Sequence, residues 1–230
     1  MTAVWITRTE PGASSMARHL RRAAIQSSVA PLIGIQRVAS DLPQGSFDLA
    51  VYLSQHTARC IDAGDVDAKR NVAIGATTQQ ALSNLGISSE LPDRATSEGV
   101  VAYVTASLKA DTRVLIVCGE EGRPTLPNRL RNLGYNVSVW RVYRRVCETR
   151  KPRLKRDCEI VELSSVSSMQ TYRKTVRRHA LVSSEEPYLV VPSRRVGKYG
   201  KVHGFGKIYV TASASSNSFV RVIRRLVLGG

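Results

Sequence analysis

Small hydroxyl side chains recur directly after short apolar runs along this sequence. They stand at Thr7, Ser54, Thr77-Thr78, Ser164-Ser165, Ser193 and Ser215-Ser216, and Arg8 follows the first of them. If the apolar runs are strands of a parallel sheet, these residues lie where such sheets bind ligands, beyond the carboxyl ends of the strands. Serine and threonine are also preferred N-caps of helices. A helix start presents free backbone N–H groups and a partial positive charge, which suit carboxylates. The pattern therefore indicates either ordinary helix caps or a site for a polycarboxylate.

Other chemistry has little support in the sequence. The segment Gly119–Arg123 matches neither a phosphate-binding P-loop nor the dinucleotide pattern G-x-G-x-x-G. The patterns G-x-S-x-G and His-Glu-x-x-His are missing too, which disfavours covalent hydrolysis and zinc chemistry. The four cysteines and four histidines are scattered without metal-ligand spacing. We therefore expect free structural thiols, histidines at surface or packing positions, no metal and no cofactor.

Charge is distributed unevenly along the chain. The 34 basic and 18 acidic residues give a net charge of +16. Residues 1–140 carry 14 basic and 12 acidic side chains, a net charge of +2. Residues 141–230 carry 20 and 6, a net charge of +14. Such a surface attracts polyanions, although a solvated basic face without a specific partner is an equally good interpretation.

The elements that must position the hydroxyl residues follow an alternating pattern. Short apolar runs alternate with segments of helical period, which is typical of βα units and a parallel sheet. Met16, Leu20 and Ala24 recur at helical spacing after Pro11, and Ser97-Glu98 provides a hydroxyl and a carboxylate for a first turn. Two predicted helices start at residues 11 and 97, and two others span residues 78–85 and 124–133. The predicted strands are 4–7, 49–53, 72–75, 114–118, 159–163, 189–191 and 208–211.

Two segments, 31–38 and 136–147, have an extended pattern and bracket about 100 residues that contain strands and helices of their own. This arrangement predicts two domains joined by a pair of strands. One domain comprises residues 1–36 and 147–230, and the inserted domain comprises 37–146. The predicted fold class is α/β, with a parallel sheet flanked by helices in each domain and a two-stranded linker between them.

The motifs, taken in order, resemble the uroporphyrinogen-III synthase family over nearly the full chain. The resemblance is carried by Ile6-Thr7-Arg8-Thr9-Glu10-Pro11, Leu53-Ser54-Gln55-His56-Thr57-Ala58, Gly75-Ala76-Thr77-Thr78-Gln79-Gln80-Ala81-Leu82, Thr96-Ser97-Glu98-Gly99-Val100, Gly119 to Arg123, Val142 to Arg145, Ser164-Ser165, Val191-Pro192-Ser193-Arg194 and Gly204-Phe205 with Val210-Thr211-Ala212. The sequence departs from the family at Leu53 and Gln79, where threonine and alanine are usual, and in its basic second half.

The resemblance implies a dehydrating cyclisation of hydroxymethylbilane to uroporphyrinogen III, with inversion of ring D through a spiro intermediate. It also implies a monomer in haem biosynthesis that needs no cofactor or metal. Since no secretory signal is visible, we expect a cytoplasmic location. Its partners would be the eight-carboxylate substrate and, transiently, the preceding pathway enzyme, with no membrane and no nucleic acid. Tyr143 matches the tyrosine that assists the leaving hydroxyl and is the favoured catalytic residue; the alternative is a packing residue on the linker strand. The matching substrate-binding residues are Arg8, Ser54, Thr78, Ser97, Gly119, Ser164, Ser165 and Ser193.

Two other functions remain as alternatives. A bilobed small-anion-binding protein also has two α/β lobes joined by strands, but no secretory signal is visible at the N-terminus. A basic nucleic-acid-binding protein without catalysis would explain the charge of the second half. Against it, aromatic residues make up only 6% of the chain and no recognition helix or stacking motif is visible.

Overall fold

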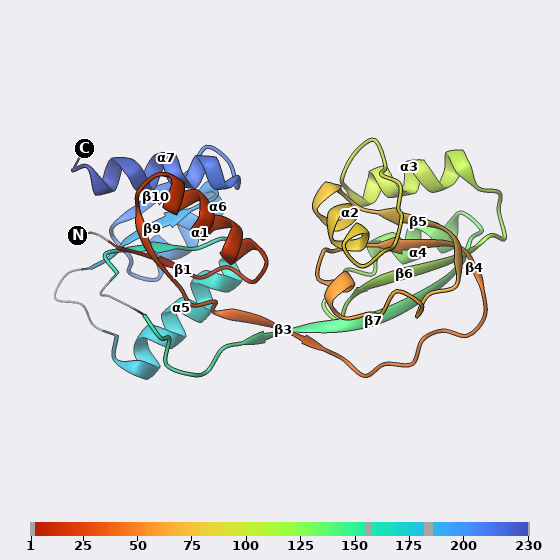
Figure 1. Ribbon diagram of the computed structural model, residues 1–230, viewed down its shortest axis with the longest axis horizontal. Coiled ribbons are helices and arrows are strands. Elements are labelled where there is room, and N and C mark those ends of the chain that lie inside the picture. Colours follow the sequence, from red (N-terminus) through yellow and green to blue (C-terminus); the bar gives the residue numbers. More distant parts are fainter. Residues whose placement is uncertain (1–2, 155–157, 182–185, 230) are drawn as a thin grey trace. The chain divides into compact units, whose positions relative to one another are not determined.

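The computed structural model describes residues 3–154, 158–181 and 186–229 (Figure 1). The chain divides into two compact units, Met1–Gly34 with Val146–Gly230, and Ile35–Arg145. We call them unit 1 and unit 2. Each contains one five-stranded sheet with helices on both faces, so the predicted α/β class is confirmed. The chain passes between the units along β3 (Ile33–Arg37) and β7 (Asn136–Cys147).

Unit 1 has a sheet in the order β10-β9-β8-β1-β2, and all its neighbouring strands are parallel. Helices α1 and α7 cover one face, while α5 and α6 cover the other. The strands are β1 (Ala3–Ile6), β2 (Gln26–Val29), β8 (Ile160–Glu162), β9 (Tyr188–Val191) and β10 (Ile208–Val210). The helices are α1 (Gly12–Arg22), α5 (Val166–His179), α6 (Arg194–Val202) and α7 (Ser216–Val227).

Unit 2 has a sheet in the order β3-β7-β6-β4-β5. Helix α2 and a short 3-10 turn pack on one face, and α3 and α4 pack on the other. The remaining strands are β4 (Phe47–Tyr52), β5 (Ala68–Ala73) and β6 (Arg113–Gly119). The helical elements are η1 (Thr57–Arg59), α2 (Ala76–Ser83), α3 (Ser97–Ser107) and α4 (Thr125–Asn132).

The central strands explain why the apolar runs were readable in the sequence. In β4, Leu49 and Val51 face α3 and α4, whereas Ala50 and Tyr52 face α2. Successive side chains of a strand point to opposite faces of the sheet, so a strand covered on both faces is apolar at every position. Strand β6 follows the same rule, and its Val114 through Val117 are fully buried.

Several elements differ from the sequence prediction in their presence or their bounds; β5, for example, spans Ala68–Ala73 instead of 72–75. Strand β2 (Gln26–Val29) was missed because it is a polar strand at the edge of the sheet of unit 1, where one flank meets no other strand. Helix α1 ends at Arg22, and Ala24 lies beyond it with φ of 57°, so Ala24 is not part of the helical stripe. Helix α3 begins at Ser97 as predicted, and its N-cap is the preceding residue, Thr96, whose hydroxyl accepts a hydrogen bond from the Gly99 N–H at 3.1 Å.

Among the described residues, every helix is too short or too polar to cross a bilayer.

Candidate functional site

The carboxyl edge of the sheet of unit 2 holds a cavity of about 230 Å³. Strand β6 ends at this edge with Gly119, and β7 runs beside it with Tyr143 as the register partner of Gly119. Ser97, from the first turn of α3, lines the same cavity. The structure therefore brings together three of the site residues predicted from the sequence, from three separate elements.

Tyr143 lies directly over the backbone of Gly119. A Cβ atom at position 119 would be 2.7 Å from Cε2 and Cζ of Tyr143 and 3.1 Å from its hydroxyl oxygen. The N–H of Glu120 donates to the Tyr143 carbonyl at 2.8 Å, which ties the loop after β6 to the backbone of β7. Gly119 is thus the residue that leaves room for the tyrosine ring, a role that its place in a glycine-bearing loop did not reveal.

Two guanidinium groups, Arg123 and Arg145, also line this cavity. Glu121 lines the cavity too, and its carboxylate accepts a hydrogen bond from the backbone N–H of Arg145 at 3.1 Å. The lining therefore carries two positive charges and one negative charge, which favours an anionic ligand. Both arginines belong to motifs that carry the family resemblance, but neither was predicted to be a site residue. Their clustering depends on the β6–β7 pairing, which no local pattern reveals.

His56 is another residue near this cavity that was not predicted from the sequence. It is 5% exposed, and its ring meets the Tyr143 ring edge-on with centroids 5.6 Å apart. Its Nδ1 atom is buried without a hydrogen-bond partner among the described residues. Burial, with further contributions from Arg145 and Arg59, lowers the pKa of His56 to about 4. The side chain next to Tyr143 is therefore a neutral imidazole at neutral pH.

Ser54 and Thr78 are not among the lining residues of the cavity. The Ser54 hydroxyl accepts a hydrogen bond from the His56 N–H at 3.2 Å, and its carbonyl accepts one from the Thr57 hydroxyl at 2.6 Å. Thr78 is 3% exposed in the first turn of α2. Ser54 therefore shapes the turn that carries His56, and Thr78 is packed inside unit 2.

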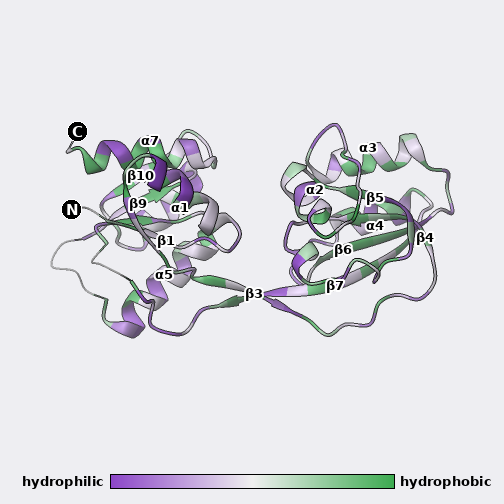
Figure 2. Cartoon of the chain, in the orientation of Figure 1, coloured by the Kyte–Doolittle hydropathy of each residue, from purple (hydrophilic) through white to green (hydrophobic). Residues whose placement is uncertain are grey.

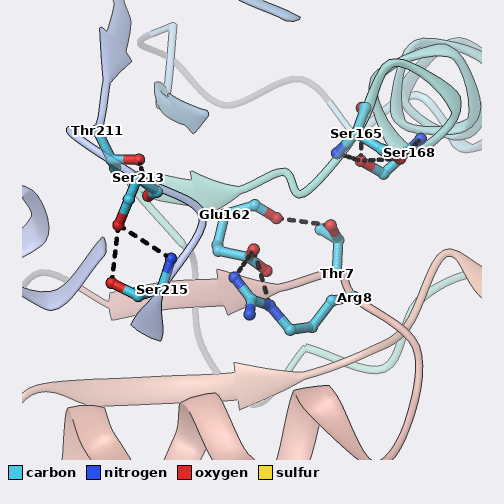
Figure 3. Close-up of polar contacts among 8 residues, drawn as sticks. All are labelled: Thr7, Arg8, Glu162, Ser165, Ser168, Thr211, Ser213 and Ser215. Atoms are coloured by element: carbon cyan, nitrogen blue, oxygen red, sulfur yellow. Dashed lines mark hydrogen bonds and ion pairs between the residues drawn. The ribbon is translucent and has the colours of Figure 1, made fainter. Parts of the chain in front are cut away.

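The carboxyl edge of the sheet of unit 1 gathers Thr7, Arg8 and Glu162 (Figure 3). The Thr7 hydroxyl donates to the Glu162 carbonyl at 2.6 Å. The Arg8 Nε donates to Oε1 of Glu162 at 2.9 Å, and a second bond from Nη2 reaches the same oxygen. The Glu162 side chain is 0% exposed, and its Oε2 has no partner among the described residues. Glu162 is the last residue of β8, and it was overlooked because it falls inside the predicted strand 159–163 rather than after it.

The Arg8 side chain is 15% exposed and lies over the Phe219 ring, 5.0 Å from its centroid. The ion pair and the stacking hold the guanidinium in place at the end of β1. Because the bonds to Glu162 use Nε and Nη2, Nη1 makes no hydrogen bond to the described residues.

The predicted hydroxyl residues of unit 1 fall into two groups. Ser165 is the N-cap of α5, where its hydroxyl accepts a bond from the Ser168 N–H at 3.1 Å in a capping box. Ser215 is the N-cap of α7, and its hydroxyl accepts a hydrogen bond from the Ser218 N–H at 3.3 Å. Ser193 is the N-cap of α6 but makes no side-chain cap bond, and Ser164 is exposed. The helix-cap interpretation therefore explains Ser165 and Ser215, while Ser164 and Ser193 keep hydroxyls that are not used as caps.

Within the described residues no cluster of three or more potential metal ligands occurs, and the four cysteines are free thiols. The chemistry available at the two carboxyl edges is that of hydrogen-bond donors: hydroxyls, helix-start N–H groups, guanidinium groups and the Tyr143 phenol. Such a set can bind carboxylates and can donate a hydrogen bond to a departing oxygen.

The comparisons with known proteins agree with this architecture. The family model of uroporphyrinogen-III synthase HemD matches residues 14–221. The fold is similar to that of the uroporphyrinogen-III synthetase of Helicobacter pylori, with a TM-score of 0.66, 12% identity, and coverage of 98% of this chain and 100% of the other. A mutant uroporphyrinogen III synthase of Thermus thermophilus has a TM-score of 0.52 and 13% identity, with both chains covered completely. No curated protein sequence matches the chain. Since the family model spans almost the whole chain, this protein belongs to the uroporphyrinogen-III synthase HemD family.

Proposed function

We propose that this protein is an active uroporphyrinogen-III synthase, which converts hydroxymethylbilane to uroporphyrinogen III without a cofactor. The observation that carries the proposal is the Tyr143 phenol in a cavity with Arg123 and Arg145, at the carboxyl edge of a parallel sheet. The arginines supply positive charge for the propionate and acetate groups of the substrate. The phenol supplies a donor for the one oxygen that must leave.

The reaction begins with loss of the hydroxyl group at the end of the linear tetrapyrrole. Tyr143 gives its phenol proton to this oxygen as the C–O bond breaks, so that the hydroxyl leaves as water. The adjacent pyrrole donates electrons to the carbon and loses its N–H proton, which balances the proton given by the phenol, and becomes an azafulvene. The electrophilic carbon is then attacked by ring D at its substituted position, giving a spiro intermediate. Fragmentation and reclosure leave ring D inverted.

Spontaneous closure of the substrate gives the other isomer, so the protein must chiefly control the conformation of the chain. Positioning of reacting groups is the appropriate source of catalysis for such a task. In unit 1, the groups assigned to substrate carboxylates are Arg8 and the hydroxyls of Ser164 and Ser193, which are not used in helix-cap hydrogen bonds. In unit 2, Ser97, Arg123 and Arg145 have the same role.

Glu162 supports Arg8 in this assignment. An arginine whose Nε and Nη2 are held by a buried carboxylate has a fixed orientation, and its remaining Nη1 donors can meet a second carboxylate. Glu162 is therefore a positioning residue in the proposal, acting on the substrate only through Arg8.

The test is to supply hydroxymethylbilane to the purified protein and to separate the uroporphyrinogen I and III isomers by chromatography after oxidation. The proposal expects the type III isomer as the main product at catalytic protein concentration. A product mixture identical to that of the spontaneous reaction, with type I alone, would refute it.

A further inference from the structure

The charged residues in the helices of unit 1 are all basic, and the proposed function does not use this positive charge. Helices α1, α5, α6 and α7 contain 14 lysine and arginine residues and no aspartate or glutamate. Unit 1 as a whole has 21 basic and 7 acidic residues, a net charge of +14, whereas unit 2 has 13 and 11, a net charge of +2. The basic second half of the sequence is therefore a property of one folded unit.

Three of these helices share one spacing near their C-terminal ends. A cation is followed by two residues, of which the second is apolar, and then by two arginines. The apolar residues are Leu20, Val176 and Ile223, and they pack into the core of unit 1. The flanking cations are all exposed. They are Arg18, Arg21, Arg22, Lys174, Arg177, Arg178, Arg221, Arg224 and Arg225, which together we call the arginine edge.

The topology brings these three groups to the same side of the sheet. Helices α1 and α5 each connect two parallel strands, so their C-terminal ends lie at the amino edge of the sheet. Helix α7 packs against α1 and runs back toward the side on which β1 begins (Figure 1). In Figure 2, hydrophilic residues appear as purple segments of α1, α5 and α7. The arginine edge is thus opposite the carboxyl edge that holds Arg8, Ser164 and Ser193.

None of the nine cations forms an ion pair within the described part of the chain. Two described carboxylates, Glu159 and Glu186, precede β8 and β9 on this side of the sheet, and that of Glu186 accepts a hydrogen bond from the Gly206 N–H at 2.7 Å. Cations in the last turn of a helix are stabilised by the helix dipole. That effect does not explain Arg18, Lys174 and Arg221, which lie a turn earlier, at the i,i+3 and i,i+4 spacing at which like charges repel.

From this we infer that the arginine edge binds the phosphate backbone of a nucleic acid duplex. Eight of the nine cations are arginines, whose planar fork matches a phosphate group better than the lysine ammonium does. The aromatic residues of these three helices, Tyr172 and Phe219, are buried, so bases cannot stack on them and a single strand has no platform. The apolar faces of the helices pack into the core of unit 1 as well. Leu228, directly after α7, is 73% exposed, but one such residue is too little apolar surface to hold a helix in a bilayer.

Binding of this kind is independent of sequence and strongly dependent on salt, because each phosphate contact releases counterions. The test is fluorescence anisotropy with a short labelled DNA duplex between about 50 and 200 mM salt, over which such contacts weaken steeply. The double variant Arg22→Gln, Arg225→Gln removes one cation from α1 and one from α7. We expect it to lower the slope of log affinity against log salt by about 1.8 and to weaken binding about tenfold or more at 100 mM salt.

The matched control is Arg94→Gln with Lys109→Gln, which removes two exposed cations of unit 2 that form no ion pair with the residues the structure describes. It should bind the duplex as the wild type does. Both double variants should keep the wild-type circular dichroism spectrum and the wild-type isomer ratio, which separates this inference from the proposed synthase activity. No duplex binding at the lowest salt, an equal loss in the control, or equal affinity for vesicles of anionic lipid or for polyglutamate would overturn the assignment to nucleic acid.

Discussion

The Tyr143 ring lies so close to the Gly119 backbone that the two residues form one structural unit of the candidate site. A single added carbon on Gly119 would sit 2.7 Å from two ring atoms. The backbone of the next residue, Glu120, is hydrogen-bonded to the Tyr143 carbonyl, so the loop cannot move aside without breaking that bond. Any side chain at position 119 must therefore displace the phenol from its place in the cavity.

Gly119→Ala should reduce the rate of type III isomer formation at least tenfold, because a misplacement of about 1 Å at a reacting group can cost about a hundredfold in rate. Overpacking should also destabilise the fold by about 1–3 kcal/mol. Gly64→Ala is the control, since a Cβ atom there meets nothing within 4 Å. Product analysis and urea unfolding of both variants check the prediction. Wild-type activity in Gly119→Ala would show that the ring position is unimportant.

Tyr143→Phe removes only the phenol oxygen and keeps the ring against Gly119. If the phenol assists the leaving hydroxyl, type III formation should slow by about a hundredfold, as for other general acids, while the unfolding midpoint remains close to that of the wild type. Tyr209→Phe, at a residue that is 40% exposed on β10, provides the comparison and should retain full activity. A Tyr143→Phe enzyme that turns over at the wild-type rate would remove this residue from the mechanism.

The Arg8–Glu162 pair should contribute to stability because the carboxylate is fully buried. Removing one partner of a buried pair leaves the other uncompensated and costs about 3 kcal/mol or more. Urea unfolding of Glu162→Gln measures this loss. Asp48→Asn breaks the exposed pair between Lys69 and Asp48, which should cost much less because solvent screens exposed ion pairs. Equal losses in the two variants would contradict the buried character of the first pair.

Thr96 and Ser97 are neighbours with different expected roles. Thr96→Ala removes the N-cap of α3 and should lower the free energy of unfolding by about 1 kcal/mol, with little change in substrate affinity. Ser97→Ala should leave stability close to the wild-type value and weaken substrate binding, because its side chain lines the cavity. Chemical unfolding and the Michaelis constant of each variant distinguish a helix-capping role from a substrate-binding role. The reverse outcome would exchange the two assignments.

The buried imidazole of His56 should make stability depend on pH. Its pKa is about 4 in the folded protein and about 6.5 in an unfolded chain. Between pH 4 and 6.5 the imidazole binds a proton in the unfolded state but not in the folded state. The contribution of neutral His56 to the free energy of unfolding is therefore present above pH 6.5 and is lost as the pH falls toward 4. Urea midpoints of the wild type should therefore fall more steeply over this range than those of His56→Phe, which keeps a ring against Tyr143. Parallel curves for the two proteins would show that His56 does not supply the dependence.

The sequence by itself determined the elements that are buried on both faces. The runs around Leu49 and Val114 are apolar at every position because helices cover both sides of the sheet, and this pattern is visible without a structure. The hydroxyls after the strands were visible for a similar reason, since the local backbone at a helix start favours serine and threonine. Strand β2 is polar and only partly buried, so its sequence lacks the apolar run from which the other strands were predicted.

Only the tertiary structure decided which of these residues meet. Arg8 and Glu162 are 154 positions apart and pair because β1 and β8 are neighbours in the sheet. His56, Gly119 and Tyr143 come from a turn and two strands, and their contacts depend on the order of β4, β6 and β7. Strand order is set by the packing of the whole core, which is a sum over many distant contacts and leaves no periodic trace in any one segment.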